Sequence, residues 1–262
     1  MSPVDGSALS VVILAAGAGR RLGRPFPKVV TPLVGLGTIL DTQLAALRST
    51  FGPAVPISVV VGFGADALIA ACPTFTYVRN DRWEHTDTAY GLGCALRGRP
   101  TTGVLWLPGD VVCDAAVLEA LGGPMAAGES CAVVTGMSNR ANAVRFTLDP
   151  EGRLRQLAPG LREGLGELAG INYVAPADRA RFIAALESCA HSDRAEYALA
   201  LAIAGGMWVH PVEVDGSLLV DVDTDGDLRR AERLFDAASF QGSQSALPGQ
   251  RGQIRSADAS RS

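Results

Sequence analysis

The 262-residue sequence has almost no lysine. Its 23 basic residues are 22 arginines and a single lysine, Lys28, which lies in a glycine-rich stretch near the N-terminus. Lysine carries a compact and mobile charge, whereas the guanidinium group of arginine is a rigid fork. The abundance of Ala and Gly indicates a GC-rich coding background in which Arg replaces Lys. A lysine kept in this background indicates a site that needs the compact charge.

Cysteine pairs and long apolar runs are also lacking. The five cysteines are widely spaced without a Cys-x-x-Cys pair, which argues against a zinc site and against disulfides. No apolar run approaches the roughly 20 residues that cross a bilayer, and residues 1–10 have no secretory signal pattern. The formal net charge of −4 argues against a protein that coats nucleic acid. We expect a cytoplasmic protein that binds neither a membrane nor nucleic acid.

Apolar strand patterns and helical patterns alternate up to residue 136, which predicts an α/β protein. The fold class that we predict is a Rossmann-like three-layer fold with a mixed, mainly parallel sheet and a small acceptor-side subdomain. The expected strands are 9–16, 57–63, 75–80, 103–112 and 130–136, and the expected helices are 38–50, 65–71, 86–97 and 114–123.

The pattern is less regular after residue 136. The predicted elements there are a hairpin around residues 149–152, a strand at 167–175, helices at 176–189 and 194–204, a hairpin or strand pair within 206–224, and a last helix at 225–238. The predicted domain spans residues 8–237, with the subdomain or lid at roughly 137–212 and a disordered tail at 238–262.

The stretch VVILAAGAGRRLGRPFPK, which ends in Lys28, has the pattern of a strand that feeds a phosphate-binding loop. A dinucleotide-binding fingerprint would also need a helix that starts inside the loop and an acidic residue at the end of the second strand. Here Pro25 and Pro27 interrupt the loop, and Gly62 stands at the tip of the second strand. Both supporting features are missing, which disfavours a bound NAD.

The same stretch resembles the signature of the sugar-nucleotidyltransferase-like superfamily, Leu-Ala-Ala-Gly-x-Gly-x-Arg-Leu followed by a spacer and Pro-Lys. The segments LPGDVV and LLVDVDTDGDLRRAERLF match two further motifs of that superfamily in the same order. The resemblance covers roughly residues 10–236. It implies an enzyme that transfers a nucleotide from a nucleoside triphosphate to a phosphate-bearing acceptor.

The resemblance assigns the glycine-rich loop to the triphosphate. Gly17 and Gly19 let backbone N–H groups approach phosphate oxygens. The predicted catalytic residues are Arg21, which can bind the β- and γ-phosphates, and Lys28, which can stabilise charge as pyrophosphate leaves. Arg20 is either a second phosphate ligand or a solvated charge. The predicted nucleotide-binding residues are Leu14, Ala15, Ala16, Gly17, Ala18, Gly19, Arg20, Asn80, Thr88 and Ala89.

Two aspartates are the metal ligands that the resemblance implies. Asp110 ends the apolar strand of the LPGDVV segment, and Asp223 lies just before the last helix. Two carboxylates with triphosphate oxygens make a reasonable octahedral Mg²⁺ site, so Mg²⁺ is the expected cofactor. Asp221 and Asp225 are close competitors, although Asp225 or Asp227 is better suited to stabilise the N-terminus of the last helix.

The segment NDRWEHTDTAYGLGCAL resembles the phosphocholine cytidylyltransferases within the superfamily. Asn80, Trp83 and Tyr90 match that group, whereas Asp87 stands where Asn is usual and Gly91 where Ser is usual. These departures leave the acceptor open. The predicted acceptor-binding residues are Asp87, Tyr90, Tyr173, Arg145 and Glu196.

The acceptor is expected to be an anion. Phosphocholine carries a quaternary ammonium group, which needs an aromatic or acidic cage, and only 6% of the residues are aromatic. Trp83, Tyr90, Tyr173 and Trp208 could form one, but a core role is the commoner explanation for each. Arginine, in contrast, is abundant near expected strand ends and loops and suits an acceptor with an added carboxylate or phosphonate. These arginines are Arg79, Arg82, Arg97, Arg140 and Arg145.

We therefore predict transfer of CMP from CTP to a small phosphonate, of the phosphonoformate or hydroxyalkylphosphonate type, with release of pyrophosphate. The GC-rich composition fits a phosphonate antibiotic pathway. The alternatives are a phosphocholine cytidylyltransferase, a sugar 1-phosphate uridylyltransferase and, in another class, a catalytically silent nucleotide-binding regulatory module. Retention of Lys28, Asp110 and Asp223 favours an enzyme over the regulatory module. A homodimer remains open.

Overall fold

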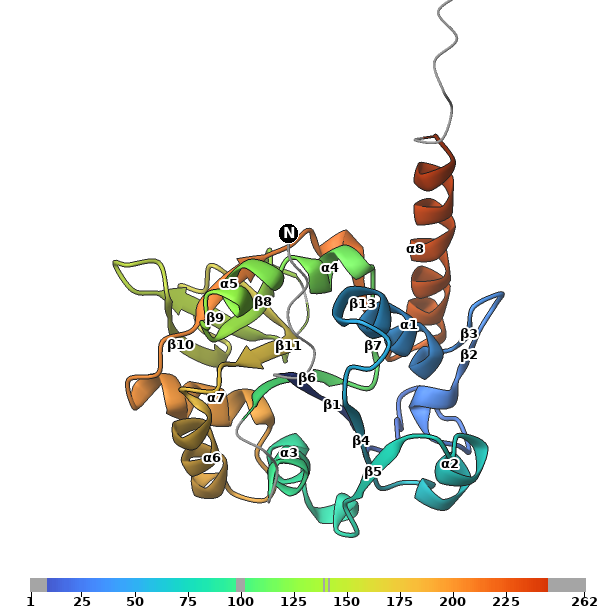
Figure 1. Ribbon diagram of the computed structural model, residues 1–262, viewed down its shortest axis with the longest axis horizontal. Coiled ribbons are helices and arrows are strands. Elements are labelled where there is room, and N and C mark those ends of the chain that lie inside the picture. The colour runs from blue at the N-terminus through green and yellow to red at the C-terminus, as the bar shows by residue number, and fades with distance from the viewer. Residues whose placement is uncertain (1–8, 98–101, 139, 141, 245–262) are drawn as a thin grey trace, which may run out of the picture.

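Strand β1 (Leu9–Ala15) lies within a nine-stranded mixed sheet (Figure 1). It pairs in parallel with β4 (Ile57–Val61) on one side and with β6 (Gly103–Pro108) on the other. β5 (Thr76–Arg79) pairs in parallel with β4. The computed structural model describes residues 9–97, 102–138, 140 and 142–244, with side chains up to residue 235. These parallel strands bring their carboxyl ends to one edge of the sheet, where the glycine-rich loop begins.

Antiparallel strands extend the sheet beyond β6. Strand β11 (Gly166–Val174) pairs with β6, and the hairpin of β9 (Val144–Leu148) and β10 (Leu154–Pro159) pairs with β11. Strand β8 (Cys131–Thr135) also pairs with β11, and β12 (His210–Glu213) pairs in parallel with β8. The predicted acceptor-side subdomain is therefore a continuation of the main sheet.

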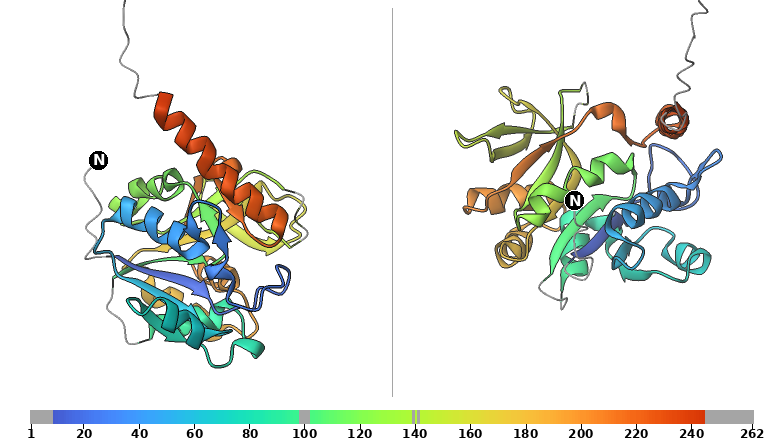
Figure 2. Two further views of the ribbon diagram at one scale, coloured as in Figure 1. Left: turned by 90° about the vertical axis from the view of Figure 1, so that its right-hand side faces the viewer. Right: turned by 45° about the horizontal axis from the view of Figure 1, so that its top comes forward.

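Helices cover both faces of this sheet (Figures 1 and 2). Val11 and Ile13 of β1 pack toward one set of helices, and Val12 packs toward the other. Because both faces are buried, nearly every position of β1 is apolar. The first set is α1 (Ile39–Phe51), α2 (Ala65–Ala71), α4 (Ala115–Glu119) and α5 (Gly122–Ala126), and the second is α3 (Thr88–Leu96), α6 (Arg179–Ser188) and α7 (Ala195–Ala204). This is the predicted three-layer α/β fold.

A smaller core joins the end of the chain to its beginning. Strand β7 (Val111–Cys113) pairs antiparallel with β13 (Leu219–Asp221), and helix α8 (Asp225–Gln244) follows β13. Val112, Val220 and Leu228 from these elements pack against Leu22 of the glycine-rich loop region. The short strands β2 (Pro32–Leu33) and β3 (Gly37–Thr38) precede α1. The smaller core therefore places the segment before α8 beside the N-terminal loop.

Three predicted boundaries were wrong. The strand expected at 103–112 breaks at Gly109, because β7 leaves the main sheet to pair with β13. Of the hairpin or strand pair expected within 206–224, the structure has two strands, but they do not form a hairpin, because β12 and β13 belong to different sheets. The helix expected at 114–123 is divided into α4 and α5.

The C-terminal boundary also differs from the prediction. Helix α8 continues to Gln244 and extends away from the sheet (Figures 1 and 2), so residues 238–244 of the predicted disordered tail are helical. The rest of that predicted tail, residues 245–262, lies outside the described residues. Within the described residues, no helix is both long enough and apolar enough to span a membrane. The cysteines are unpaired, as their spacing predicted.

Candidate active site

The glycine-rich loop leaves β1 at the carboxyl edge of the sheet and turns back through residues 19–23. The N–H groups of Leu22 and Gly23 donate to the carbonyl oxygen of Gly19, at 3.0 and 3.3 Å. Gly19 has a φ of +57°, and a Cβ added there would lie 3.0 Å from the Cβ of Lys28. Only glycine combines this backbone conformation with this close approach. The turn therefore packs directly on the aliphatic part of Lys28.

Lys28 begins a short 3₁₀ helix (Lys28–Val30) directly after Pro27. Its Nζ donates to Asp110 Oδ2 at 2.8 Å and to Asp223 Oδ1 at 2.7 Å. The Lys28 side chain is only 10% exposed. Burial alone would lower the pKa of Lys28, but the carboxylates of Asp110 and then Asp223 outweigh it, so the pKa lies above its ordinary value. Lys28 is therefore held as a cation between the two predicted metal ligands.

Asp110 reaches this position because β6 ends close against β1. The N–H of Gly109 donates to the carbonyl of Leu14 at 2.8 Å. A Cβ at Gly109 would lie 2.6 Å from Val29 Cγ1 and 3.0 Å from Ala15 Cβ, so a larger residue would push the turn away. The Val222 N–H donates to the Asp110 carbonyl at 2.9 Å, which joins this turn to the segment before α8.

A third carboxylate, that of Asp221, completes the cluster. Asp110, Asp221 and Asp223 each offer an oxygen within 4.8 Å of the others. Two of the three have an arginine partner as well: Arg21 Nη1 lies 2.7 Å from Asp223 Oδ2, and Arg140 Nη1 lies 2.7 Å from Asp221 Oδ2. Burial, then the charges of Asp110 and Asp223, raise the pKa of Asp221 to about 6, against the lowering effect of Arg140 and Lys28.

The donor set fits a divalent cation. Carboxylate oxygens are the ligands that Mg²⁺ prefers in proteins. The Lys28 ammonium group already occupies a position bridged by Asp110 and Asp223, which shows that these two carboxylates converge on a cation. Asp227 does not belong to this set, because its Oδ2 accepts from the N–H groups of Asp223 and Thr224 and so caps α8. The expected helix-stabilising role at Asp225 or Asp227 is thus found at Asp227.

Removing the Asp221 charge should stabilise the protein in metal-free buffer. A carboxyl whose folded pKa is raised binds a proton more readily in the folded state, so stability falls as pH rises from about 4 to about 6. We expect Asp221→Asn to raise the free energy of unfolding at pH 7 by about 2 kcal/mol, with little change at pH 4. Denaturant titrations at both pH values measure this. A destabilisation at pH 7 would mean that the ion pair with Arg140 outweighs the repulsion.

The predicted nucleotide-binding residues lie at the carboxyl edge, and several already hold neighbouring loops. The Leu14 carbonyl accepts from Gly109, and the Ala16 carbonyl accepts from the Phe63 N–H at 2.9 Å. Gly17 and Arg20 are exposed on the loop. A role for this loop in binding the triphosphate remains a prediction.

The residues that were predicted to bind substrates near the start of α3 form hydrogen bonds with other parts of the chain. The N–H of Ala89 donates to the Asp193 carbonyl at 3.1 Å, and Thr88 Oγ1 accepts from the Ala195 N–H at 2.9 Å. Asp87 caps α3 through its Oδ1, which accepts from the Thr88 N–H. Asn80 is buried, and its side chain binds the Arg82 N–H and Thr86 Oγ1. Thr88, Ala89, Asp87 and Asn80 therefore fix this segment, and the first two join it to the chain at the start of α7.

The predicted acceptor residues do not all lie together. Tyr173 is 5% exposed and packs in the core, where its ring lies against Gly103 at the amino end of β6, away from the carboxyl edge. Its assignment to the acceptor was wrong. Arg145 donates to the Leu161 carbonyl at 3.2 Å and so holds the β10–β11 turn. Tyr90 packs edge-on against His191, and Glu196 is nearly buried beside Arg194.

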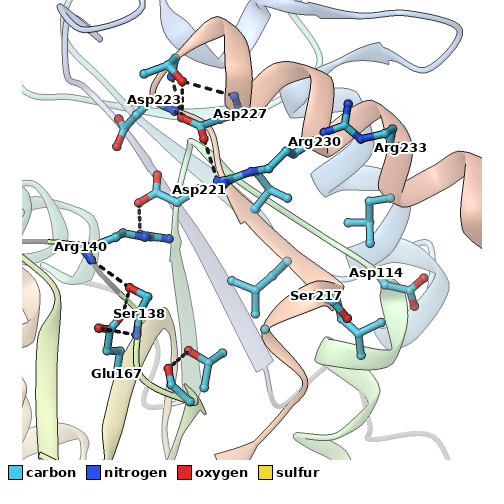
Figure 3. A pocket seen from close by; sticks show the side chains of 18 of the residues that line it. Asp114, Ser138, Arg140, Glu167, Ser217, Asp221, Asp223, Asp227, Arg230 and Arg233 are labelled. Carbon is cyan, nitrogen blue, oxygen red and sulfur yellow. Dashed lines mark hydrogen bonds and ion pairs between the residues drawn. The ribbon is translucent and has the colours of Figure 1, made fainter.

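A cleft of about 1190 Å³ lies beside Asp221 and Asp223, between the start of β11, the loop after β8 and α8 (Figure 3). Two of its lining residues, Ser138 and Glu167, were not among the site residues predicted from the sequence. Ser138 N and Oγ donate to the Glu167 carboxylate at 3.0 and 2.6 Å. Glu167 is buried in a strand, and no local pattern distinguishes such a residue from a surface glutamate.

Solved structures of known proteins share this fold. The inositol-1-phosphate CTP transferase of T. maritima aligns with a TM-score of 0.69 and 17% identity over 87% of this chain and 96% of that one. The CTP:phosphocholine cytidylyltransferase of Streptococcus pneumoniae aligns with a TM-score of 0.67 and 14% identity, over 87% and 99%. A nucleoside-diphosphate-sugar pyrophosphorylase of Vibrio cholerae aligns with a TM-score of 0.67 and 12% identity, over 85% and 99%.

Sequence comparison gives the family. The bifunctional protein GlmU of Neisseria meningitidis serogroup B is 29% identical over 256 residues, which are 90% of this chain and 53% of that protein. The chain thus spans about half the length of this curated relative. The model of the MobA-like NTP transferase domain matches residues 11–240, which include the loop, Lys28 and all three aspartates. The chain belongs to the family of MobA-like NTP transferase domains.

Proposed function

We propose that this nucleotidyltransferase moves CMP from CTP to a small phosphonate, of the phosphonoformate or hydroxyalkylphosphonate type, and releases pyrophosphate in the cytoplasm. The observation that carries the proposal is the position of Lys28, whose Nζ lies between Asp110 and Asp223 beside a glycine-rich loop. A cation held there stands next to the α-phosphate of a triphosphate that lies on the loop. Positioning and charge neutralisation are the main needs of phosphoryl transfer.

In the proposed reaction, a phosphonate oxygen of the acceptor attacks the α-phosphorus, and the bond to the bridging oxygen of pyrophosphate breaks. Pyrophosphate leaves with the electron pair of that bond, and no covalent enzyme intermediate forms. Lys28 neutralises charge at the α-phosphate, and Arg21 binds the departing phosphates. Asp110 and Asp223 would hold Mg²⁺, with Asp221 beside them. When bound, Mg²⁺ supplies charge neutralisation at the phosphate oxygens.

The choice of CTP is supported by two of the structural neighbours, whose names describe CTP-dependent transfer. The nucleotide would contact the loop from Leu14 to Arg20. Asn80, Thr88 and Ala89 would support the part of the site that binds the base. The exposed glycine at position 17 leaves the loop backbone open to the nucleotide.

The choice of an anionic acceptor is supported by the contacts of the aromatic side chains. Trp83 packs edge-on against Phe63, and the guanidinium group of Arg82 lies over the Tyr90 ring. The guanidinium group of Arg153 lies over one face of the otherwise exposed Trp208 ring. With Tyr173 in the core, the four aromatic residues considered for a cage around a quaternary ammonium group are otherwise engaged. This arrangement disfavours phosphocholine.

A sugar 1-phosphate is the second candidate acceptor. The size of the cleft beside Asp221 and Asp223 leaves room for a hexose, and one structural neighbour is named as a nucleoside-diphosphate-sugar pyrophosphorylase. The nucleotide donor would then be UTP rather than CTP.

Pyrophosphate release from each nucleoside triphosphate, with Mg²⁺ and a panel of acceptors, tests the proposal. The panel contains phosphonoformate, a hydroxyalkylphosphonate, phosphocholine and sugar 1-phosphates. We expect turnover with CTP and a phosphonate. Turnover only with UTP and a sugar phosphate would establish the second candidate, and nucleotide binding without any pyrophosphate release would establish a regulatory module.

A further inference from the structure

Arg140 is a cation at the carboxylate cluster that comes from a different part of the fold than Arg21 and Lys28. It lies in the loop between β8 and β9, and its Nη1 donates to Asp221 Oδ2 at 2.7 Å (Figure 3). Its side chain is 51% exposed, whereas that of Asp221 is 27% exposed. One end of the guanidinium group is thus anchored on the cluster while the rest faces solvent in the cleft.

A buried carboxylate fixes the backbone of Arg140 through Ser138. The Arg140 N–H donates to Ser138 Oγ at 3.2 Å, and Ser138 N and Oγ donate to the two oxygens of Glu167 (Figure 3). Glu167 is only 4% exposed. Burying a carboxylate is costly unless hydrogen bonds satisfy it, and Ser138 satisfies both oxygens of this one. Through Ser138, Glu167 therefore holds the backbone N–H of Arg140 at a defined position.

The guanidinium group has donors to spare. It carries five N–H donors in a planar fork that matches the oxygens of a phosphate or phosphonate. Other arginines on this side have different partners: Arg145 donates to the Leu161 carbonyl, and Arg194 donates to the Asn142 carbonyl and pairs with Glu196. Of these three, only Arg140 reaches the carboxylate cluster.

We propose that Arg140 binds the phosphonate or phosphate group of the acceptor, with Asp221 as its tether and with Ser138 and Glu167 as positioning residues. This inference rests on the proposed function, since it names the group that holds the attacking anion. Lys28 and Arg21 serve the triphosphate, and Arg140 serves the acceptor. An acceptor must then carry a phosphonate or phosphate dianion, and an alcohol without one is not a substrate.

Direct binding tests the proposal without turnover. The probe is methylphosphonate, titrated by calorimetry into the full chain with Mg²⁺ and a non-hydrolysable CTP analogue. We expect Arg140→Ala to weaken its binding about 30-fold and Arg140→Lys to restore part of it, because a lysine keeps the charge but loses the fork. Arg155→Ala is the matched control, since Arg155 is an exposed arginine on β10. It should bind like the wild type.

Kinetics separate a positioning role from a structural one. With the preferred acceptor, Arg140→Ala should raise the acceptor KM about 30-fold and leave the nucleotide KM within about twofold. Glu167→Gln should raise the acceptor KM less, and adding it to Arg140→Ala should cause no further rise, because both act through one group.

Two binding results would overturn the inference: no methylphosphonate binding by the wild type, or equal binding by the wild type and Arg140→Ala. A parallel rise in the nucleotide KM would also overturn it, by assigning Arg140 to the triphosphate. Binding of methylphosphonate that depends on Arg140, together with no pyrophosphate release from any acceptor, would instead refute the proposed function and leave the anion site standing.

Discussion

Replacing Lys28 with alanine is expected to lower kcat for pyrophosphate release by about 10³-fold, since removing one group that stabilises transition-state charge typically costs 10² to 10³. Nζ of Lys28 contacts both Asp110 and Asp223, at 2.8 and 2.7 Å. Its loss removes the charge that faces the α-phosphate. Steady-state kinetics at saturating nucleotide and acceptor measure the effect, and circular dichroism checks that the fold persists.

Lys28→Arg is the informative companion variant. The lysine side chain is almost buried, and its stem packs under Gly19. A guanidinium group is larger and needs a planar arrangement of acceptors, so it should not fit between the two carboxylates. We expect Lys28→Arg to recover less than a tenth of the lost rate. Near-normal turnover by Lys28→Ala would remove Lys28 from the mechanism, and near-normal turnover by Lys28→Arg would show that the charge alone matters there.

The residues of the candidate site that the sequence points to most directly are those with strong local patterns. The turn at Gly19 requires a positive φ, and the close approach at Gly109 requires the absence of a side chain, so glycine marks both positions in the sequence. Asp110 follows directly from the end of an apolar strand. The resemblance implies roles for Lys28, Asp110 and Asp223 in one site, and in the structure Lys28 contacts both aspartates.

The sequence could not show which backbone groups are already engaged by distant segments. Ala89 was predicted to bind the nucleotide, and the structure adds that its N–H donates to the carbonyl of Asp193, far along the chain. The loop that carries Asp193 has no pattern that assigns it to α3. Hydrogen bonds between irregular segments depend on tertiary packing, which periodicity does not record.

Tyr173 and Glu167 show that the sequence also does not give the direction in which a strand pairs. Both lie on β11, but Tyr173 packs near the amino end of β6, whereas Glu167 pairs with Thr135 at the end of β8 and lines the cleft. The antiparallel direction of β11 decides which end faces the site. A strand pattern alone does not give the direction of pairing, so the tyrosine was assigned to the wrong end of the sheet.

Removing either predicted metal ligand should abolish metal-dependent stabilisation as well as activity. We expect Asp110→Asn and Asp223→Asn each to lower kcat by about 10³-fold or more, because they would weaken the charge neutralisation that a bound Mg²⁺ supplies at the phosphates. In thermal unfolding, Mg²⁺ or Mn²⁺ should raise the Tm of the wild type but not of these variants. Asp225→Asn is the control, since Asp225 pairs with Arg24 outside the cluster. It should respond to metal like the wild type.

The position of Lys28 predicts a second effect on metal binding. Its ammonium group bridges the carboxylates that would hold the metal, so we expect a metal to compete with it for them. A neutral residue of similar length, as in Lys28→Met, should therefore strengthen Mn²⁺ binding by about tenfold, although it inactivates the enzyme. Calorimetric titration of Mn²⁺ measures this.

Weaker Mn²⁺ binding by Lys28→Met would mean that Lys28 positions Asp110 and Asp223 for the metal, and unchanged binding would place the metal elsewhere. Only stronger binding agrees with a lysine that shares its carboxylates with the cation and is released toward the α-phosphate when the metal binds.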